Sequence, residues 1–391
     1  MQLRVISANR TLEITEVCEL LVGPRMKAFY CTCLSLYQLG TLWSYASVFG
    51  EAVASVVPLP GFNGGSTCDI YDADNATSCR SLYRAWVGVF TLIGVPLSLL
   101  DVREQAGFQV TMTFIRIAIV GVMVLTCIVA SATDADREAT WGEEGVDRGH
   151  VPNWKFGGVF GSFSIVVFAE LLNASMGILS GALASKSDLG VVVAGGMGIT
   201  AVGYMIIALA VGSYFGLAVD DSSNVNWRQY NIKPIRWLVV GFPALDVLSV
   251  FPMNVIISAN NLMALWYGDS ARVSEALASP MLRAAWRVGV ALPSIVLALF
   301  WYKLDQILAF TGVIGMLIAF AIPSRLYPLS RRMCQKCFGA NAPLAGPLFI
   351  NSWLGSDQRV SWGIALFGGA MAILTLIGTV LIYATGHDSV L

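Results

Sequence analysis

Charged residues are scarce in this sequence, and histidine is almost missing. Only 13% of its 391 residues are Asp, Glu, Lys or Arg, against about 25% in ordinary globular domains. The two histidines, His150 and His387, lie outside every long hydrophobic run. Membrane enzymes that use metal ions or haem need histidine clusters at bilayer depth, and a paired-aspartate protease needs a second intramembrane aspartate. We therefore expect no catalytic residues and no metal site, and we also expect no nucleic-acid partner.

Hydrophobic residues take the place of the missing charges. They make up 56% of the chain, and the mean hydropathy is +0.69. Several runs with one charge or none approach or exceed the roughly 20 residues that cross a bilayer as a helix. The pattern predicts an all-α, polytopic integral membrane protein with about nine spans. The predicted spans are residues 28–50, 85–100, 107–131, 156–184, 189–219, 237–266, 283–302, 306–324 and 360–386.

The charges in the terminal segments and loops predict the orientation of the chain in the membrane. Residues 1–27 carry several charges and no apolar core, so we expect a cytosolic tail and no signal peptide. Lys and Arg are then more numerous on the inner side, and an odd number of spans leaves residues 386–391 outside or in a lumen. The plasma membrane, endomembranes and lysosomes stay open as locations. Residues 28–385 are expected to form one transmembrane domain. It includes an outer loop at 58–83, a second, acidic outer loop at 132–155 and an inner interfacial segment at 338–358.

The first outer loop contains Cys68, Cys79 and Asn75, which begins an Asn-Ala-Thr sequon. This set suits an oxidising lumen, where disulfides and glycans form. We expect a glycan on Asn75 and a disulfide between the two cysteines, with pairing elsewhere or free thiols as the alternatives. Cys334 and Cys337 form a lone CxxC motif, and two unpaired cytosolic thiols are favoured over a zinc or redox site.

Four charged residues fall at membrane depth: Glu51, Arg116, Glu170 and Asp246. Each is costly against lipid and should face protein or a water-filled cavity. For Glu51 and Arg116 we favour snorkelling to the interface or a structural ion pair. Glu170 and Asp246 have long uncharged flanks, so a functional role and a structural role have similar weight. Prolines on both sides of Asp246 each delete a backbone donor, and the resulting breaks create polar sites within membranes.

The order of four segments resembles a known transporter family. They are a Gly-Val-Pro-Leu segment at 94–100, residues 160–180, the two Phe-Pro pairs around Asp246 and residues 304–323. They resemble the fourth, sixth, eighth and tenth helices of the amino acid/auxin permease family. Members of that family are secondary transporters with eleven spans and a broken-helix, inverted-repeat core.

The sequence departs from the family pattern in two places. On this alignment residues 28–50 correspond to the family's third helix, so its first two helices are not found among the nine spans. Val166, Val167 and Phe168 stand where relatives often place polar residues, and the stretch contains no proline.

The resemblance implies an amino acid transporter coupled to H⁺ or Na⁺ that works by alternating access in a lipid bilayer. Its implied roles are substrate binding by Ser164, Glu170 and Asn173, coupling-ion binding by Asp246 and Ser249, and structural pairing by Arg116. Besides the coupling ion no cofactor is expected, and protein partners are left open. The alternative is a non-transporting nutrient sensor or scaffold that keeps the fold, which the missing helices and the apolar residues 166–168 favour. A membrane enzyme is the least favoured class.

Overall fold

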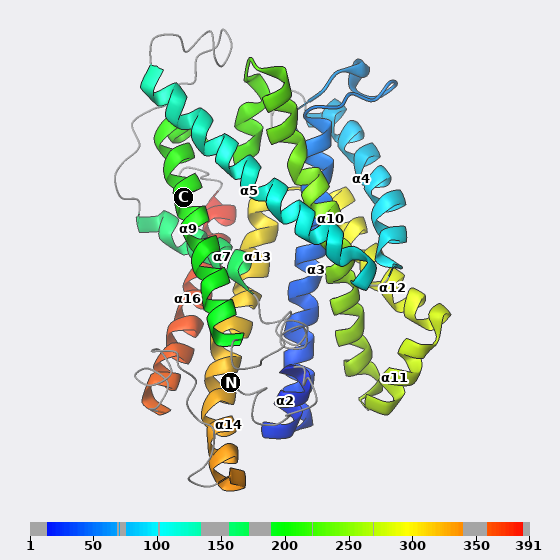
Figure 1. Ribbon diagram of the computed structural model, residues 1–391, viewed down its shortest axis with the longest axis vertical. Helices are drawn as coiled ribbons and strands as arrows, with labels where there is room; N and C mark the ends of the chain where they lie inside the picture. Colours follow the sequence, from blue (N-terminus) through cyan, green and yellow to red (C-terminus); the bar gives the residue numbers. More distant parts are fainter. Residues whose placement is uncertain are drawn as a thin grey trace.

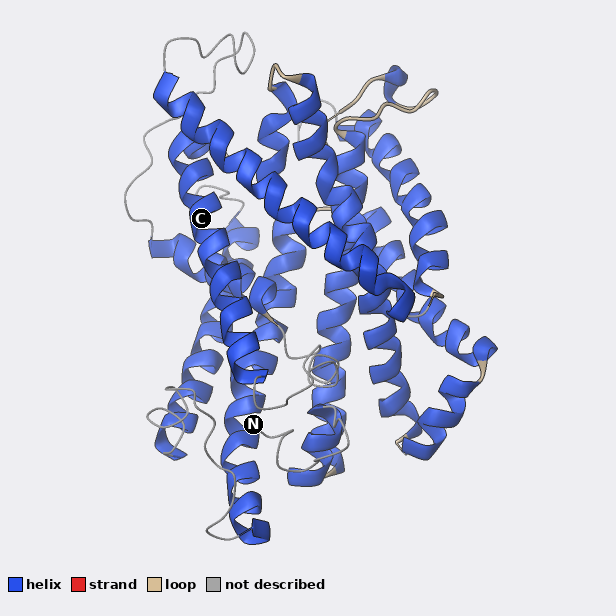
Figure 2. Cartoon of the chain, viewed as in Figure 1, coloured by secondary structure: helices blue, strands red, loops and turns tan. Residues whose placement is uncertain are grey.

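All the regular secondary structure in the described part of the protein is helical. The computed structural model describes residues 14–68, 70, 76–100, 102–133, 156–171, 189–220, 222–268, 270–338 and 358–385. Within these residues there are twelve α-helices and no strand. Figure 2 shows the helices and the loops that join them. The prediction of an all-α protein is confirmed.

The helices are mostly long, and short 3-10 or π segments join some of them. The α-helices are α2 (Ile14–Leu21), α3 (Pro24–Ala54), α4 (Ala76–Ser98), α5 (Val102–Thr133), α7 (Phe156–Glu170), α9 (Leu189–Phe215), α10 (Lys233–Tyr267), α11 (Ser270–Ala278), α12 (Pro280–Phe300), α13 (Leu304–Met316), α14 (Ile322–Phe338) and α16 (Gln358–Thr385). The short segments are 3-10 turns at Asn63–Gly65, Gly216–Ala218 and Ser223–Gln229, and a π-helical turn at Leu317–Ala321.

Seven stretches of the described residues are long and apolar enough to cross a membrane, so the protein is polytopic. They are Ser78–Ser98, Gly107–Ala132, Leu189–Ala218, Lys233–Tyr267, Pro280–Phe300, Leu304–Ser330 and Val360–Gly378. Each corresponds to a predicted span. One boundary differs, because α4 begins at Ala76 and the end of the predicted outer loop is therefore helical.

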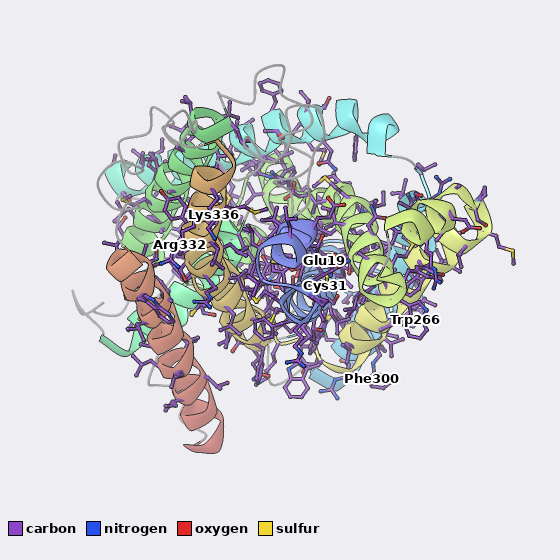
Figure 3. All side chains as sticks on the ribbon, turned by 90° about the horizontal axis from the view of Figure 1, so that it is seen from below. Glu19, Cys31, Trp266, Phe300, Arg332 and Lys336 are labelled. Carbon is purple, nitrogen blue, oxygen red and sulfur yellow. A yellow bond between two sulfur atoms is a disulfide. The ribbon has the colours of Figure 1, made fainter. Side chains whose placement is uncertain are left out.

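The predicted span at 28–50 lies in α3, which is long enough to cross but less apolar than the other seven. Its 31 residues extend about 46 Å at the usual rise of an α-helix. Its composition is explained by its position: α3 lies in the centre of the bundle (Figures 1 and 3) and packs against α4, α10, α12 and α13. A central helix can carry polar side chains because they face other helices and not lipid. The buried polar side chains of α3 include Gln38, Thr41, Ser44, Ser47 and Glu51.

Only the first half of the predicted span at 156–184 lies within the described residues, and it forms α7. Helix α7 ends at Glu170 after 15 residues, about 22 Å, which is shorter than the roughly 30 Å hydrocarbon core. Residues 172–184 lie outside the described residues. The described part of this segment therefore does not cross a bilayer by itself.

The two prolines around Asp246 do not break their helix, contrary to the prediction. Helix α10 runs without interruption from Lys233 to Tyr267, with Pro243 and Pro252 inside it. Each proline lacks the N–H that would reach the carbonyl four residues earlier. Transmembrane helices tolerate such sites where neighbouring helices hold the segment in place, and α10 packs closely against α3, α4, α5 and α12.

Helices α4 and α12 run antiparallel, and each satisfies the last carbonyl groups of the other. Arg287 of α12 is buried, and its Nη1 donates to the carbonyl oxygens of Ser98, Leu99 and Leu100 at 3.0–3.2 Å. At the opposite end, Tyr83 donates to the carbonyl of Ala298 at 2.9 Å and Arg84 to that of Leu299 at 3.1 Å. Helix ends expose carbonyls without intrahelical partners, and cations are favoured beside them.

Candidate functional site

Polar side chains from five different helices lie close to one another around one ion pair. Its members are Tyr45 of α3, Arg116 of α5, Glu170 of α7, Tyr204 of α9 and Asp246 of α10, which we call the five-helix polar cluster. Arg116 Nε donates to Asp246 Oδ1 at 3.1 Å, and Nη2 of the same guanidinium donates to the same oxygen. Tyr45 and Tyr204 lie within electrostatic reach of both members of this ion pair, and Glu170 lies within reach of Tyr204.

Helix α5 brings Arg116 to Asp246 by crossing α10 obliquely, as Figure 1 shows. Gln109 lies seven residues before Arg116 and therefore two turns away on the same face of α5. Its side-chain amide donates to the main-chain oxygen of Ser249 on α10. Two polar contacts, one near each end of this stretch of α5, therefore fix how the two helices lie against each other.

The ion pair is partly accessible. The side chain of Arg116 is 41% exposed and that of Asp246 is 24% exposed. A fully buried pair loses its hydration, whereas both of these side chains keep part of their surface exposed in the structure. This accessibility separates the pair from the packed core around it.

Ser249 is close to Asp246 along the helix, but its hydroxyl is already used. Its Oγ donates to the main-chain oxygen of Asp246 at 2.7 Å, and the side chain is buried. This back-bonding to the preceding turn is a common local role of serine in helices. The structure thus places Ser249 beside the backbone of Asp246, with its hydroxyl engaged there.

The predicted substrate residues fall in three different places. Ser164 is fully buried between α7 and α13, where its hydroxyl donates to the Ala309 carbonyl at 3.1 Å. Its described contacts are therefore packing contacts. Glu170 ends α7, and its buried Oε1 has no hydrogen-bond partner among the described residues. Asn173 lies outside the described residues.

Two other buried charges belong to the helix packing. Glu51 is buried in α3 and lies within electrostatic reach of Tyr83 of α4. Sequence reasoning did not single out Arg287, although it lies within the predicted span 283–302 and is buried at the end of α4. The signal was present, because an arginine inside a predicted span should have an identifiable partner.

The first outer loop is tied to the start of α4. Cys68 and Cys79 form a disulfide in the structure, with their Cα atoms 5.6 Å apart. Asn75 lies outside the described residues, and the side chains of Cys334 and Cys337 are also not described. Among the described residues, no three His, Cys, Asp or Glu side chains gather where a metal ion could bind.

Comparison with known proteins identifies the family. The sequence model of a family described as "Transmembrane amino acid transporter protein" matches residues 7–338. The chain belongs to this family. The match includes α2 to α14 and every member of the five-helix polar cluster. The family is one of transporters and not of enzymes, and the resemblance found in the sequence is confirmed.

Three curated proteins match the chain at low sequence identity. Transmembrane protein 104 is 21% identical in mouse, over 78% of this chain and 61% of the relative. The human and Pongo abelii proteins of the same name are 21% and 22% identical, each over 88% of this chain and 69% of the relative. The chain thus matches about two thirds of the length of these relatives.

Proposed function

We propose that the chain moves amino acids or similar small solutes across a membrane, coupled to H⁺ or Na⁺, by alternating access. The observation that carries this proposal is the partly accessible Arg116–Asp246 ion pair between two membrane-spanning helices. Membership of an amino acid transporter family supports the solute class. Asp246 is our proposed coupling site, with Ser249 supporting its local backbone.

The chemistry of the pair explains how coupling would work. A proton or a sodium ion on the Asp246 carboxylate removes the negative charge that Arg116 contacts. The guanidinium stays charged at every physiological pH, so it then needs another anion within the membrane. The carboxylate of an amino acid meets that need, and Oε1 of Glu170, which has no hydrogen-bond partner among the described residues, offers an acceptor for the amino group. Coupling ion and solute would therefore favour each other's binding.

The fold that we propose is the broken-helix, inverted-repeat core of this transporter class. Helix α7 ends at Glu170, a member of the five-helix polar cluster, and this position of the helix end supports the proposed fold. Broken helices place their free ends at the solute site in such transporters. The 338–358 segment and the outer acidic loop at 132–155 lie largely outside the described residues and enter no part of this proposal.

Uptake by the purified full chain in proteoliposomes tests the proposal. A mixture of labelled amino acids is supplied under an imposed pH or sodium gradient. Wild type should accumulate label, and Asp246→Asn should lose the gradient-driven part by at least about tenfold while staying folded at the assay temperature. Glu19→Gln is the matched control, because it makes the same chemical change in the Lys27–Glu19 ion pair outside the candidate spans.

The outcomes separate the candidate functions. Gradient-driven uptake by folded Asp246→Asn at the wild-type rate would contradict the coupling role. Binding of amino acids without uptake by wild type, seen as a ligand-dependent rise in Tm, would support the sensor alternative. Neither binding nor uptake of any amino acid would contradict the proposed solute class.

A further inference from the structure

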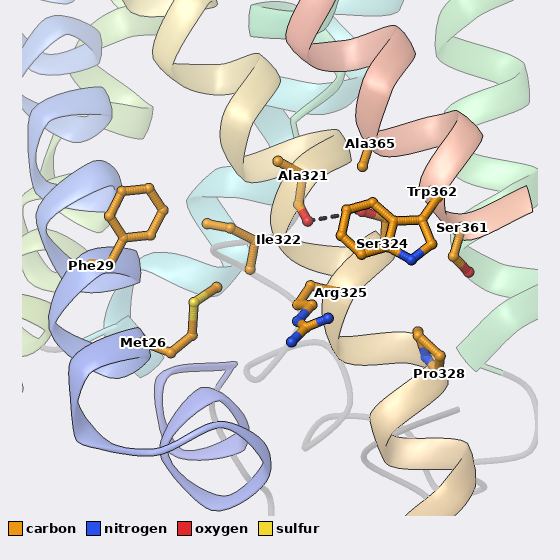
Figure 4. A pocket seen from close by; sticks show the side chains of 10 residues that line it. All are labelled: Met26, Phe29, Ala321, Ile322, Ser324, Arg325, Pro328, Ser361, Trp362 and Ala365. Atoms are coloured by element: carbon orange, nitrogen blue, oxygen red, sulfur yellow. Dashed lines mark hydrogen bonds between the residues drawn. The ribbon is translucent and has the colours of Figure 1, made fainter. Parts of the chain in front are cut away.

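A second site lies at one end of the bundle, away from the five-helix polar cluster. It is a groove of about 290 Å³ between the start of α3, the first half of α14 and the start of α16. Figure 4 shows Met26 and Phe29 of α3 on one side, Trp362 of α16 on the other, and Ile322 and Arg325 of α14 between them. We call it the α3–α14–α16 groove.

The position of the groove relative to the membrane indicates which molecule can reach it. Arg325 lies near the end of the candidate span Leu304–Ser330, and Trp362 lies near the start of Val360–Gly378. Both spans therefore enter or leave the membrane at the groove. Arginine and tryptophan are the side chains that concentrate at this level, where lipid headgroups meet acyl chains. Phospholipid is the molecule present there at high concentration.

The lining of the groove is mainly apolar, and its polar members are Ser324, Arg325 and Ser361. Most of its wall consists of aliphatic, methionine and aromatic side chains, and Phe29 and Trp362 are both exposed. Arg325 is the single charged residue of the lining, and its exposed side chain has no hydrogen bond or ion pair to any other described residue. A ligand with an apolar chain and an anionic head matches this arrangement.

The positive charge along α14 indicates which lipid headgroup would bind. After Arg325 the helix continues with Arg331, Arg332 and Lys336, and the sequence has no Asp or Glu between Asp305 and Asp357. Figure 3 shows Arg332 and Lys336 at this end of the molecule. Basic pockets between transmembrane helices recognise anionic lipid headgroups. A zwitterionic lipid would bring its own cation into a positively charged region.

We propose that the α3–α14–α16 groove binds an anionic phospholipid, with its phosphate at Arg325 and an acyl chain against Met26, Phe29 and Trp362. This site is separate from the proposed transport site. Its ligand would join α3, at the centre of the bundle, to α14 and α16 at its side. Bound lipid should therefore stabilise the packing of these three helices.

Thermal unfolding of the full chain in detergent tests this site. Added palmitoyl-oleoyl phosphatidylserine should raise Tm more than the same concentration of phosphatidylcholine. Arg325→Gln should weaken the apparent phosphatidylserine affinity about fivefold, the effect of one basic residue near an anionic headgroup. Arg325→Lys should keep most of the affinity because the charge is retained. Lys336→Gln is the matched control, with the same charge change on the same helix outside the groove lining.

Three other outcomes would each contradict the proposal. An equal response to both lipids would show ordinary solvation by lipid without headgroup selection. If Arg325→Gln and Lys336→Gln lose the same amount of phosphatidylserine affinity, the effect comes from the total charge of α14 and not from a site at Arg325. A comparable rise in Tm with inorganic phosphate alone would show an anion site that makes no use of the apolar wall. None of these results depends on amino acid transport.

Discussion

Arg116 and Asp246 show what a charge inside a bilayer requires at the scale of single residues. Neither residue is near the other in sequence, yet the guanidinium makes two hydrogen bonds to one carboxylate oxygen. Arg287 meets the same requirement differently, since three main-chain carbonyls take the place of a carboxylate. The first charge is partly exposed, whereas the second is buried against the end of a helix.

The Arg116–Asp246 pair predicts a specific pattern of stability changes. Arg116→Gln or Asp246→Asn alone leaves one charge without its partner and should lower the free energy of unfolding by about 2 kcal/mol, less than for a fully buried pair because both side chains are partly exposed. The double variant should recover about half of the summed loss. Thermal unfolding in detergent measures all four proteins. Strictly additive losses would contradict a direct interaction.

The buried thiol of Cys18, which lies outside the candidate spans, should make the stability of the protein depend on pH. Burial raises the pKa of its thiol to about 12, and nearby Cys31 adds to the effect. The unfolded thiol has a pKa of about 8.5, so the folded protein favours the protonated form. This contribution to stability is fully present below about pH 8.5 and is lost as pH rises toward 12.

The same burial should protect Cys18 from thiol reagents. N-ethylmaleimide at pH 7.5 should leave Cys18 unmodified in the folded protein, because only the thiolate reacts. Peptide mass spectrometry measures the modified fraction, and protein unfolded in SDS supplies the fully reactive control. Fast labelling of the folded protein would show that α2 does not stay packed on α3.

At the scale of helices, close approach and end capping decide which elements lie together. Gly312 of α13 faces Ser164 of α7 so closely that a Cβ there would lie 2.5 Å from the Ser164 carbonyl oxygen. Helices α4 and α12 use a different device, since each donates hydrogen bonds to the final carbonyls of the other. Both devices act between segments that are far apart in sequence.

Gly312→Ala should separate α7 from α13. The serine hydroxyl can rotate away, but its backbone cannot, so the overpacking should destabilise the protein by about 1–3 kcal/mol. Gly88→Ala is the matched control, because a Cβ at Gly88 of α4 meets nothing within 4 Å and alanine has the higher helix propensity. Equal Tm values for the two variants would contradict the tight α7–α13 contact.

Arg287→Gln should destabilise the junction of α4 and α12 by about 3 kcal/mol, because three carbonyls lose a charged donor in a buried place. Arg287→Lys should lose less, since the charge remains but one ammonium cannot reach all three oxygens as well. Arg272→Gln, an exposed change on α11, should alter stability by less than about 0.5 kcal/mol. Chemical or thermal unfolding in detergent compares them, and a neutral Arg287→Gln would rule out the capping role.

At the scale of the whole molecule, two kinds of feature lie at opposite ends of the bundle. Figure 1 shows the loop before α4 at one end, and α2 and the end of α14 at the other. The first end has the Cys68–Cys79 disulfide, which suits an oxidising compartment. The second has the basic residues of α14, which suit the cytosolic side.

This separation supports the predicted orientation and gives it a test. A glycosylation sequon added after Leu391 should be modified in a eukaryotic host, and one placed near residue 335 should not, because the predicted orientation puts the two positions on opposite sides of the membrane. Wild-type protein should also lose mass on glycosidase treatment, and Asn75→Gln should lose that response. Modification near residue 335 would show that the predicted orientation is wrong.

Much of the element content was predictable, because helix formation and membrane insertion depend on local runs of apolar residues. Seven predicted spans are helices of the expected length. The prediction of a break beside Asp246 was wrong, since the loss of two backbone donors did not outweigh the packing of α10 against its neighbours. The polar character of α3 gave a hint of its central position, but a single sequence does not say which helices surround it.

The sequence by itself determined that this is an all-helical membrane protein of a transporter family, and that Asp246, Glu170 and Arg116 needed protein or water around them. Only the tertiary structure decided that Arg116 contacts Asp246, that Ser164 packs against α13, and that Arg287 caps α4. The physical reason is the range of the interactions. Hydrophobicity and helix propensity act along the chain, whereas a buried charge finds its partner through the packing of helices that the sequence separates by more than a hundred residues.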